Sequence, residues 1–439
     1  MKLQVTNGGE IEVYQVNVYN IDGYNYFKLR DVGKYLGFEV EYQEEKNEAQ
    51  IFATANNLET PAPLTTPGST GKVVLGNERI LLEYEHLIKG KRLGLITNQT
   101  GIDSKGLRTV DKLFHYPYGD LIAIYSPEHG LDGKQKAGAY VSSYTDTTLN
   151  LPVYSLYGAT REPSKEMLKD VDVLIFDIQD IGSRTYTYVS TMNYAMKAAK
   201  KEGIKFVVLD RPNPLGGEIV EGYMLEDKYK TFVGVDKMPM AHGMTAGELA
   251  KYYNRDIGVD LEIVPMENWT RKMIWQDTGL PFAQTSPNIP NLESAFNYMA
   301  AGIGDGTGVV QGDKFTWVGG KGIDSYEFAR RLNAYDLPGI RFTPENKDDK
   351  GGVRLTITDY HQFNPQKTGT YVLATANQIA DIKIPVETNG VIPMFEKIHG
   401  SDKMGNALRR KLDPEEIVRE YQRELEEFKN LRRQYLIYN

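Results

Sequence analysis

One short segment of the chain combines a carboxyl group and an imidazole in a turn. Glu128 and His129 follow Pro127 directly, and the segment Ser126–Gly130 comes straight after the apolar run Leu121–Tyr125. Proline restricts the backbone at the start of the turn, so we expect the glutamate to point into a crevice beyond a strand. A carboxyl group partly removed from water can act as a general acid, and the histidine could orient it or contact a substrate. The alternative is a structural turn whose glutamate caps a neighbouring helix.

A second polar segment supplies candidates for another catalytic group. Asp177 and Asp180 follow the apolar run Val171–Phe176, and either could act as a base or a nucleophile. Arg184 lies at the predicted start of a helix, where backbone N–H groups also point outward, and this arrangement suits an anionic substrate group. Tyr186 is a further candidate for substrate binding. The alternative is an Arg–Asp pair that braces the turn.

Two other polar segments follow apolar runs and add candidate substrate contacts. Pro212 and Pro214 flank Asn213 and leave its side chain little freedom, which suits the orientation of a sugar hydroxyl or an amide. Asp210 could be a second catalytic carboxylate, or only the ion-pair partner of Arg211. The substrate-binding candidates in these segments are Asn98, Gln99 and Thr100 after one run, and Asp210, Arg211 and Asn213 after the other.

Two residues farther along the chain complete the candidate set. His242 precedes a capping box at Thr245–Glu248, although a lone histidine is more often structural than catalytic. Asn288 lies in a loop stiffened by prolines that could line a cleft. His129 and His242 show no metal-ligand spacing, and neither a dinucleotide-binding glycine motif nor a Walker A motif follows any apolar run. We therefore expect no metal and no cofactor.

The elements that must position these residues form a simple pattern. Near-continuous apolar runs of this length are typical of strands buried on both faces, as in a parallel sheet. Ligands bind beyond the carboxyl ends of such strands, so four polar segments at four strand ends describe one site. The predicted strands are Arg92–Thr97, Leu121–Tyr125, Val171–Phe176 and Ile204–Leu209. The pattern predicts an α/β fold with a Rossmann-like parallel sheet.

A second lobe, of the α+β class, is expected after about residue 285. Strand-like stretches at Val353–Thr358 and Thr370–Ala374 follow glycine-rich loops. Asp413 and Pro414 mark the start of a charged helix that continues to about Arg433, and the segment after it is expected to dock back onto the body. In the first lobe, one helical face is marked by Val189, Met192, Met196 and Ala199.

Composition excludes several classes of function. The formal net charge is −8 and no basic stripe is present, which argues against nucleic-acid binding. The chain has no cysteine, so disulfides, thiol nucleophiles and thiolate-bound metals are excluded. No apolar stretch approaches the roughly 20 residues that a membrane span needs, and the N-terminus carries no signal-peptide core. The protein is therefore cytoplasmic, or its signal is absent from this sequence.

The N-terminal part resembles a stalk domain called copper-amine-oxidase-N-terminal-like, through the stretch Ile21–Phe38. Such modules occur in secreted and surface proteins of Gram-positive bacteria, and no histidine precedes His86, so copper binding is not expected. We interpret this part as a small α+β spacer that could attach the protein to the cell wall. The predicted parts are the stalk domain at 1–52, a linker at 53–73, the Rossmann-like lobe at 74–285 and the α+β lobe at 286–439.

The polar segments together resemble the NamZ-type exo-β-N-acetylmuramidases, a glycoside hydrolase family formerly described as a domain of unknown function. The resemblance covers roughly residues 75–439 and is carried by Leu87–Gly101, Ser126–Gly130, Leu151–Gly158, Phe176–Tyr188, Leu209–Gly217, His242–Thr245 and Tyr435–Leu436. It implies a cleft between the two lobes and removal of N-acetylmuramic acid from the non-reducing ends of peptidoglycan fragments. The family's catalytic glutamate falls on Glu128. The resemblance also implies a secreted or cell-surface protein of a Gram-positive bacterium.

One segment departs from the family pattern. Family members usually carry Gly-Arg-Gly-Thr-Thr about where this chain reads Gly302–Asp313, and that arginine is absent. If that arginine helps to grip the lactyl carboxylate of muramic acid, the substrate preference of this chain is open. Here Arg184 or helix N-terminal amides would hold that carboxylate.

Two routes for the reaction remain open at this point. A second carboxylate could complete it, or the 2-acetamido group of the substrate could assist. A carboxyl separation of about 5 Å favours a nucleophile, and one of roughly 6.5–9.5 Å favours an inverting base. Two other functions also stay open: a non-catalytic protein that binds cell-wall glycan, and a sugar- or nucleotide-modifying transferase.

Overall fold

The computed structural model describes residues 72–439 and, before them, the backbone of six strands. The chain divides into two compact units, Met1–Thr70 and Gly71–Asn439. In the first unit a four-stranded sheet has the order β2-β1-β6-β5, and β3 pairs with β4. Its strands are β1 (Lys2–Asn7), β2 (Glu10–Gln15), β3 (Asn20–Ile21), β4 (Tyr24–Asn25), β5 (Phe38–Gln43) and β6 (Glu48–Ala53). Most of the predicted linker, residues 54–71, lies outside the described residues.

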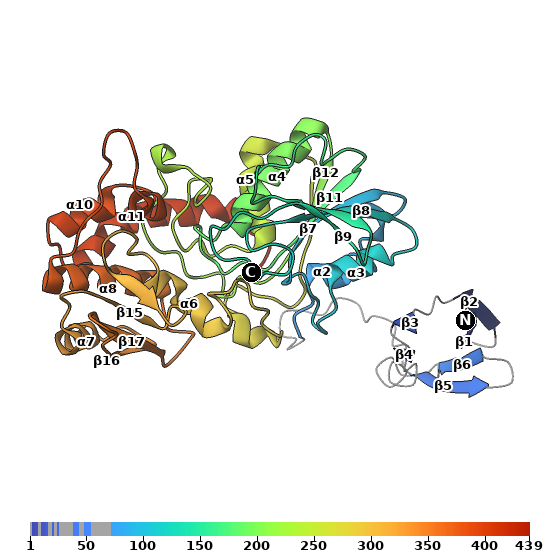
Figure 1. The fold of residues 1–439 in the computed structure, drawn as a ribbon, viewed down its shortest axis with the longest axis horizontal. Coiled ribbons are helices and arrows are strands. Elements are labelled where there is room, and N and C mark those ends of the chain that lie inside the picture. The colour runs from blue at the N-terminus through green and yellow to red at the C-terminus, as the bar shows by residue number, and fades with distance from the viewer. Residues whose placement is uncertain are drawn as a thin grey trace. The chain divides into compact units, whose positions relative to one another are not determined.

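The larger unit contains a seven-stranded sheet in the order β13-β12-β11-β7-β8-β10-β9 (Figure 1). All neighbouring strands are parallel except β9 and β10. The strands are β7 (Arg92–Thr97), β8 (Asp120–Ser126), β9 (Tyr144–Asp146), β10 (Leu151–Ser155), β11 (Val173–Asp177), β12 (Lys205–Leu209) and β13 (Leu261–Val264). The four predicted strands are therefore the central neighbours β12, β11, β7 and β8. The predicted α/β fold with a parallel sheet is confirmed.

The two faces of this sheet pack into two separate hydrophobic clusters. In β11, Leu174 and Phe176 belong to one cluster and Ile175 to the other, as the pleat of a strand requires. The helices of this lobe are α2 (Gly76–Arg79), α3 (Thr109–Phe114), α4 (Tyr188–Glu202) and α5 (Ala246–Ile257). The predicted apolar face of α4 lies in the first cluster, and α3 packs in the second. Burial of these faces holds the sheet, and hence its strand ends, in place.

The second lobe is built on a four-stranded antiparallel sheet in the order β14-β15-β17-β16. Its elements are α6 (Leu292–Ala301), β14 (Val310–Gly312), β15 (Trp317–Gly320), α7 (Ser325–Ala334), β16 (Ile340–Pro344), β17 (Gly351–Ile357), α8 (Pro365–Ala380), α9 (Met394–His399), α10 (Lys403–Arg409) and α11 (Pro414–Arg432). The apolar residues of this lobe belong to the same cluster as those of α4. The two lobes therefore share one continuous core.

The stretch Thr370–Ala374 is helical, and the prediction of a strand there was wrong. It lies in the middle of α8, where Asn364 caps the helix by accepting from Lys367 N at 3.1 Å and Pro365 occupies the first helical position. Its β-branched and aromatic residues favour strands, but they are buried against the neighbouring helices of the core. Tertiary packing therefore overrides the local preference.

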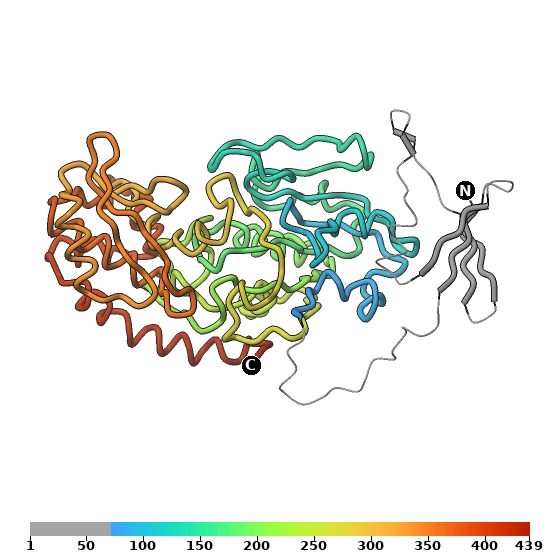
Figure 2. The backbone as a smooth tube through the Cα atoms, turned by 90° about the horizontal axis from the view of Figure 1, so that it is seen from below, coloured from blue at the N-terminus to red at the C-terminus, as the bar shows by residue number. Residues whose placement is uncertain are grey.

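After α11 the chain returns from the second lobe to the first, as predicted (Figure 2). Tyr438 Oη donates to Asp210 Oδ2 at 2.6 Å, and Ile437 N donates to Glu248 Oε1 at 2.9 Å. These contacts tie the end of the second lobe to the strand-end region of β12. Within residues 72–439, no helix has the length and hydropathy that crossing a membrane requires.

Candidate active site

Glu128 lies just beyond the carboxyl end of β8, at the edge of the sheet where ligands bind in such folds. β8 pairs with β10 through Ser126 and Ser155, and Leu156 N donates to the Ser126 carbonyl at 2.8 Å. Glu128 and Tyr157 each lie two residues beyond these pairing partners. Glu128 is only 8% exposed. The Glu128 carboxyl group is thus held near the surface but shielded from most solvent.

Two donors hold the Glu128 carboxylate. Thr187 Oγ1 donates to Oε2 at 2.6 Å, and Gly138 N donates to Oε1 at 2.8 Å. Thr187 immediately precedes α4, whereas Gly138 lies in the loop that follows Glu128 itself. A hydroxyl group can donate or accept, so Thr187 can bond both the ionised and the protonated carboxyl group.

His129 shapes the loop that carries one of these donors. Its backbone has a φ of 72°, a left-handed conformation that is costly for a residue other than glycine and frequent at functional sites. His129 Nδ1 lies 2.7 Å from the carbonyl oxygen of Gln135, and Gln135 N donates to the His129 carbonyl at 3.1 Å. The imidazole also packs edge-on against Tyr188, with ring centroids 6.4 Å apart.

Three tyrosines form an edge-to-face cluster within electrostatic reach of this carboxyl group. The ring centroids of Tyr186 and Tyr188 are 4.9 Å apart, and those of Tyr186 and Tyr298 are 5.8 Å apart. Tyr186 Oη donates to Thr285 Oγ1 at 2.8 Å, and Tyr188 Oη donates to the carbonyl of the same residue. Burial raises the pKa of Tyr186 and of Tyr188 well above the usual range, so both phenols stay protonated. Tyr298 belongs to α6, so the second lobe contributes to this cluster.

Asp180 is a second carboxyl group near the same tyrosines. Gly182 N donates to Asp180 Oδ2 at 2.7 Å, while Oδ1 is buried without a hydrogen-bond partner among the described residues. Burial raises the pKa of Asp180 to about 7. Burial also raises the pKa of Tyr298, and the charges of Glu128 and Asp180 raise it further. Both carboxyl groups therefore act on one phenol.

The polar residues after β7 support this region. Gln99 Nε2 donates to the carbonyls of Gln284 and Thr285 at 2.8 and 3.0 Å. Asn98 Oδ1 accepts from Thr100 N and Oγ1, and its Nδ2 is buried without a partner among residues 72–439. Gln99 thus reaches the same threonine as the two tyrosines, whereas Asn98 and Thr100 mainly build the turn.

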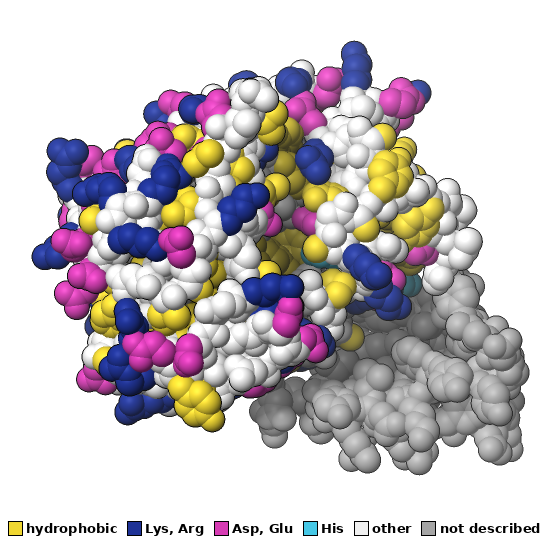
Figure 3. All heavy atoms as spheres, turned by 60° about the vertical axis from the view of Figure 1, so that its left-hand side comes forward, with side chains coloured by type: hydrophobic (Ala, Val, Ile, Leu, Met, Phe, Trp, Pro, Cys, Tyr) yellow, Lys and Arg dark blue, Asp and Glu magenta, His cyan; other side chains and the backbone are white. Residues whose placement is uncertain are grey.

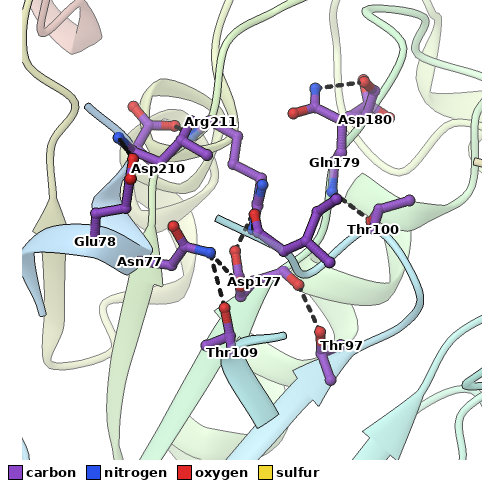
Figure 4. Close-up of polar contacts among 12 residues, drawn as sticks. Asn77, Glu78, Thr97, Thr100, Thr109, Asp177, Gln179, Asp180, Asp210 and Arg211 are labelled. Carbon is purple, nitrogen blue, oxygen red and sulfur yellow. Dashed lines mark hydrogen bonds and ion pairs between the residues drawn. The ribbon is translucent and has the colours of Figure 1, made fainter. Parts of the chain in front are cut away.

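Asp177, predicted as a catalytic candidate, forms a buried ion pair instead. Its Oδ1 lies 2.6 Å from Arg211 Nε, and its Oδ2 lies 3.4 Å from Asn77 Nδ2 (Figure 4). Arg211 also donates to the carbonyl of Ile102 at 2.9 Å. Asp177 is fully buried as the last residue of β11, and Arg211 is 3% exposed. Both groups are buried and engaged with each other, so we correct both assignments to structural ones.

Asp210 is likewise a structural residue rather than a second catalytic group. Its carboxylate accepts from Gly247 N at 2.7 Å, Thr245 Oγ1 at 2.8 Å and Tyr438 Oη at 2.6 Å, besides Arg211 N at 2.9 Å. The residue is fully buried, and burial raises its pKa to about 6. With every oxygen engaged, it anchors the start of α5 to the end of β12.

Arg184 does not offer its guanidinium to a substrate, contrary to the prediction. It is 2% exposed and donates to the carbonyls of Met238 at 2.8 Å, Tyr223 at 3.3 Å and Ile398 at 2.6 Å. Burial lowers its pKa to about 9. Because Ile398 lies in the second lobe, Arg184 joins the two lobes through backbone carbonyls. The alternative of an Arg–Asp ion pair is not seen among its contacts in residues 72–439.

The remaining candidates fall outside the tyrosine cluster. His242 is fully buried, and burial lowers its pKa to about 3, so its imidazole is neutral. Asn213 accepts from Leu215 N at 3.0 Å and lies so close to Gly182 that a Cβ at Gly182 would meet its Oδ1 at 2.3 Å. Asn288 is exposed in a turn. Within residues 72–439 no three His, Asp or Glu side chains are arranged to hold a metal ion.

One face of the two-lobed body is hollowed, as a ligand site would be. On the face drawn in Figure 3, hydrophobic side chains gather in a hollow, and charged side chains are spread over the surface around it. Ligand sites are typically concave and largely apolar, with a few polar groups that fix orientation.

Comparison with known proteins identifies the family. The N-terminal family model of the exo-β-N-acetylmuramidase NamZ matches residues 93–293, and the C-terminal NamZ model matches residues 296–438. The chain belongs to the NamZ exo-β-N-acetylmuramidase family. It is 42% identical over 382 residues to the peptidoglycan β-N-acetylmuramidase NamZ of Bacillus subtilis, covering 84% of this chain and 92% of that protein. The predicted family is confirmed.

Two solved structures of proteins with unassigned function share this fold. Both are crystal structures of DUF1343 family proteins from Bacteroides fragilis. One is 34% identical with a TM-score of 0.74, and the other is 26% identical with a TM-score of 0.65. Each match covers 84% of this chain and 99% of the relative. The part common to all these proteins is therefore the two-lobed body.

Sequence reasoning missed several residues that lie near Glu128. Thr187 and Tyr188 belong to the Phe176–Tyr188 stretch that carries the family resemblance. Only the folded chain shows that they contact the loop after β8, Thr187 through Glu128 and Tyr188 through His129. Tyr298 is on an amphipathic helix, where an aromatic residue is usually part of the core.

Proposed function

We propose that this protein is an exo-acting glycoside hydrolase that removes N-acetylmuramic acid from the non-reducing ends of peptidoglycan fragments. The observation that carries the proposal is the strand-end position of Glu128, shielded and held by Thr187 and Gly138. Membership of a family of exo-β-N-acetylmuramidases supports the same reaction. The B. subtilis relative is named as a peptidoglycan β-N-acetylmuramidase.

In this proposal Glu128 is the general acid that protonates the leaving glycosidic oxygen. Thr187 and Gly138 N donate to the two carboxyl oxygens and so keep the side chain oriented, while the acid proton of Glu128 is directed to the leaving oxygen and passes to it as the glycosidic bond breaks. Tyr298 is partly exposed and suits packing against a sugar ring, while the buried Tyr186 and Tyr188 behind it hold its ring in place.

Asp180 is the second carboxyl group in this proposal, in place of Asp177 and Asp210. Its Oδ1 has no partner among the described residues, and a pKa of about 7 lets it exchange a proton at neutral pH. It could act as a base or nucleophile, or orient the 2-acetamido group of the substrate. Asp177 and Asp210 are excluded from this role because their oxygens are already engaged and buried.

The decisive experiment compares wild type with Glu128→Gln on two substrates. The disaccharide N-acetylmuramyl-N-acetylglucosamine has a poor leaving group, whereas 4-nitrophenyl β-N-acetylmuramide has a good one. Loss of a general acid should lower kcat by about 10²- to 10⁴-fold on the disaccharide and far less on the aryl glycoside. Glutamine keeps an acceptor for Gly138 N and a donor for Thr187, so the fold should survive.

Two results would contradict this proposal in different ways. No turnover of either substrate by the wild type would reject the muramidase activity and favour a glycan-binding protein. Equal losses of kcat on both substrates would reject Glu128 as the acid while keeping the activity. The matched control is Asp120→Asn, at the opposite, amino end of the same strand β8, which should leave both rates unchanged.

We also propose that the enzyme works outside the cell, with residues 1–52 holding it near the cell wall. The stalk-like sequence of these residues and a substrate derived from peptidoglycan support this location. The test is co-sedimentation with purified cell-wall sacculi of the full chain and of a chain that starts at Gly71. Equal sedimentation of both proteins would reject the role of the N-terminal unit.

A further inference from the structure

Arg161 is an exposed arginine on the loop that follows β10, beside the strand that leads to Glu128. Its guanidinium carbon lies 4.7 Å from the ring centroid of Tyr157 and 4.5 Å from that of Phe232. These two rings lie against each other with centroids 5.8 Å apart. An arginine stacked on two aromatic rings loses little further freedom when its N–H groups bind a ligand.

No carboxylate in residues 72–439 forms an ion pair with Arg161. Its polar contact there is with the hydroxyl group of Tyr157, a neutral partner that leaves the positive charge uncompensated. The carboxylate of the adjacent Glu162 is instead engaged by Lys201. A stacked guanidinium keeps the edge of its fork free, and that edge matches a carboxylate in bidentate geometry.

Tyr157 connects this cation to the proposed general acid. Tyr157 and Glu128 occupy matching positions past the paired ends of β10 and β8. Burial raises the pKa of Tyr157, the charge of Glu128 raises it further, and the charge of Arg161 lowers it. The phenol is therefore within electrostatic reach of both groups. The acid and the cation flank one tyrosine.

We infer that Arg161 binds the lactyl carboxylate of N-acetylmuramic acid and so selects this sugar over N-acetylglucosamine. The inference rests on the proposed function, because it concerns the sugar bound next to Glu128. The lactyl ether at C3 is the only carboxylate on this sugar, and it lies two ring carbons from the C1 bond that the acid must protonate. Arg161 and Glu128 both act on Tyr157, so the cation lies on the side of the acid where that carboxylate could be recognised.

Other cations are less suited to this task. Arg184 is buried and bonded to three backbone carbonyls. Lys136 is exposed in the loop after Glu128, but no aromatic ring fixes its ammonium group in the described part of the chain. Lys136 therefore serves as the matched control, with the same charge and a similar location.

The test measures binding first, so that it does not depend on turnover. N-acetylmuramic acid and its methyl ester, which lacks the charge, are titrated into the full chain by calorimetry. Wild type should bind the acid at least about tenfold more tightly than the ester, as expected for a charge-assisted bidentate contact. Arg161→Gln should remove this preference, Arg161→Lys should keep part of it, and Lys136→Gln should keep all of it.

Kinetics then separate this inference from the proposed function. On 4-nitrophenyl β-N-acetylmuramide, Arg161→Gln should lower kcat/KM by at least about tenfold through KM, and it should leave turnover of the corresponding glucosaminide unchanged. A preference for the acid that persists in Arg161→Gln, or that is absent in wild type, would overturn the inference. If wild type binds the acid selectively but cleaves no muramide, the proposed function fails while the role of Arg161 stands.

Discussion

The hydroxyl group of Thr187 donates to Glu128 Oε2 at 2.6 Å and joins the loop after β8 to the start of α4. This contact crosses 59 residues of sequence and links the proposed acid to the helix that covers one face of the sheet. The orientation of Glu128 therefore depends on an element other than its own loop.

Replacing Thr187 by valine should lower kcat/KM by about tenfold, because one charge-assisted hydrogen bond contributes roughly 1.5 kcal/mol or more. Thr187→Ser keeps the hydroxyl group and should stay close to wild type. Steady-state kinetics on the disaccharide substrate measure both. Thr191→Val is the control on α4, since within residues 72–439 the Thr191 hydroxyl has one hydrogen bond, to the backbone carbonyl of Thr187. Full activity of Thr187→Val would show that the Thr187 hydroxyl group does not contribute to catalysis.

Asp177 should prove important for stability and not for chemistry. Asp177→Asn leaves Arg211 buried without its counter-ion, and breaking a buried pair typically costs about 3–5 kcal/mol. Urea unfolding should show that loss, whereas kcat of the folded variant should remain within a few-fold of wild type. Asp180→Asn should give the opposite result, a large loss of kcat with a smaller change in stability. If Asp177→Asn abolished kcat without destabilising the fold, the structural assignment of Asp177 would be wrong.

The contrast between Asp177 and Asp180 shows which part of the site the sequence alone cannot predict. Both follow the same apolar run, three residues apart, and residue type alone does not separate them. Asp177 is the last residue of β11, and its pairing with Thr97 fixes it inside the sheet, next to Arg211. Asp180 lies beyond the strand and keeps one oxygen free of described partners. The register of a strand depends on its neighbours, so only the folded chain tells them apart.

The pH dependence of stability should report the ionisation of Asp180. Its pKa is about 7 in the folded protein and near 4 in the unfolded chain, so the folded state binds more protons between these values. Stability from this group is therefore present at low pH and lost as pH rises through about 7. Asp180→Asn removes the pH dependence that this carboxyl group causes. The free energy of unfolding of the variant, minus that of the wild type, should therefore increase from pH 4 to pH 8. Urea unfolding at four or five pH values measures it, and a constant difference would contradict the assigned ionisation.

Tyr438 should stabilise the body more at high pH than at low pH. Its hydroxyl donates to Asp210, whose pKa is about 6, so above that pH the acceptor is charged and the hydrogen bond is stronger. Tyr438→Phe should lower the free energy of unfolding by about 1.5–3 kcal/mol at pH 8 and by less at pH 4.5. Tyr435→Phe is the control, because the Tyr435 hydroxyl makes no hydrogen bond to residues 72–439. Equal losses at both pH values would show that the charge on Asp210 is irrelevant.

Long apolar runs were enough to predict the parallel sheet, because strands buried on both faces need continuous hydrophobic residues. Arg184 shows the limit for the site. An arginine near a helix start suits an anion, yet the packing of the second lobe brings the Ile398 carbonyl to Arg184 from 214 residues away. Contacts between lobes leave no mark on local composition. Tyr298 was missed for the same reason, and Arg161 was missed because its ring partner Phe232 is distant in the sequence.

The bond between Tyr438 and Asp210 also bears on the order in which the protein is made. The two residues are 228 positions apart, and a ribosome delivers the carboxylate long before the phenol. Until Tyr438 leaves the exit tunnel, the end of β12 must hold Asp210 with fewer donors than in the finished fold. The nascent first lobe therefore lacks this hydrogen bond during synthesis of the second, and the bond forms only after Tyr438 has left the ribosome.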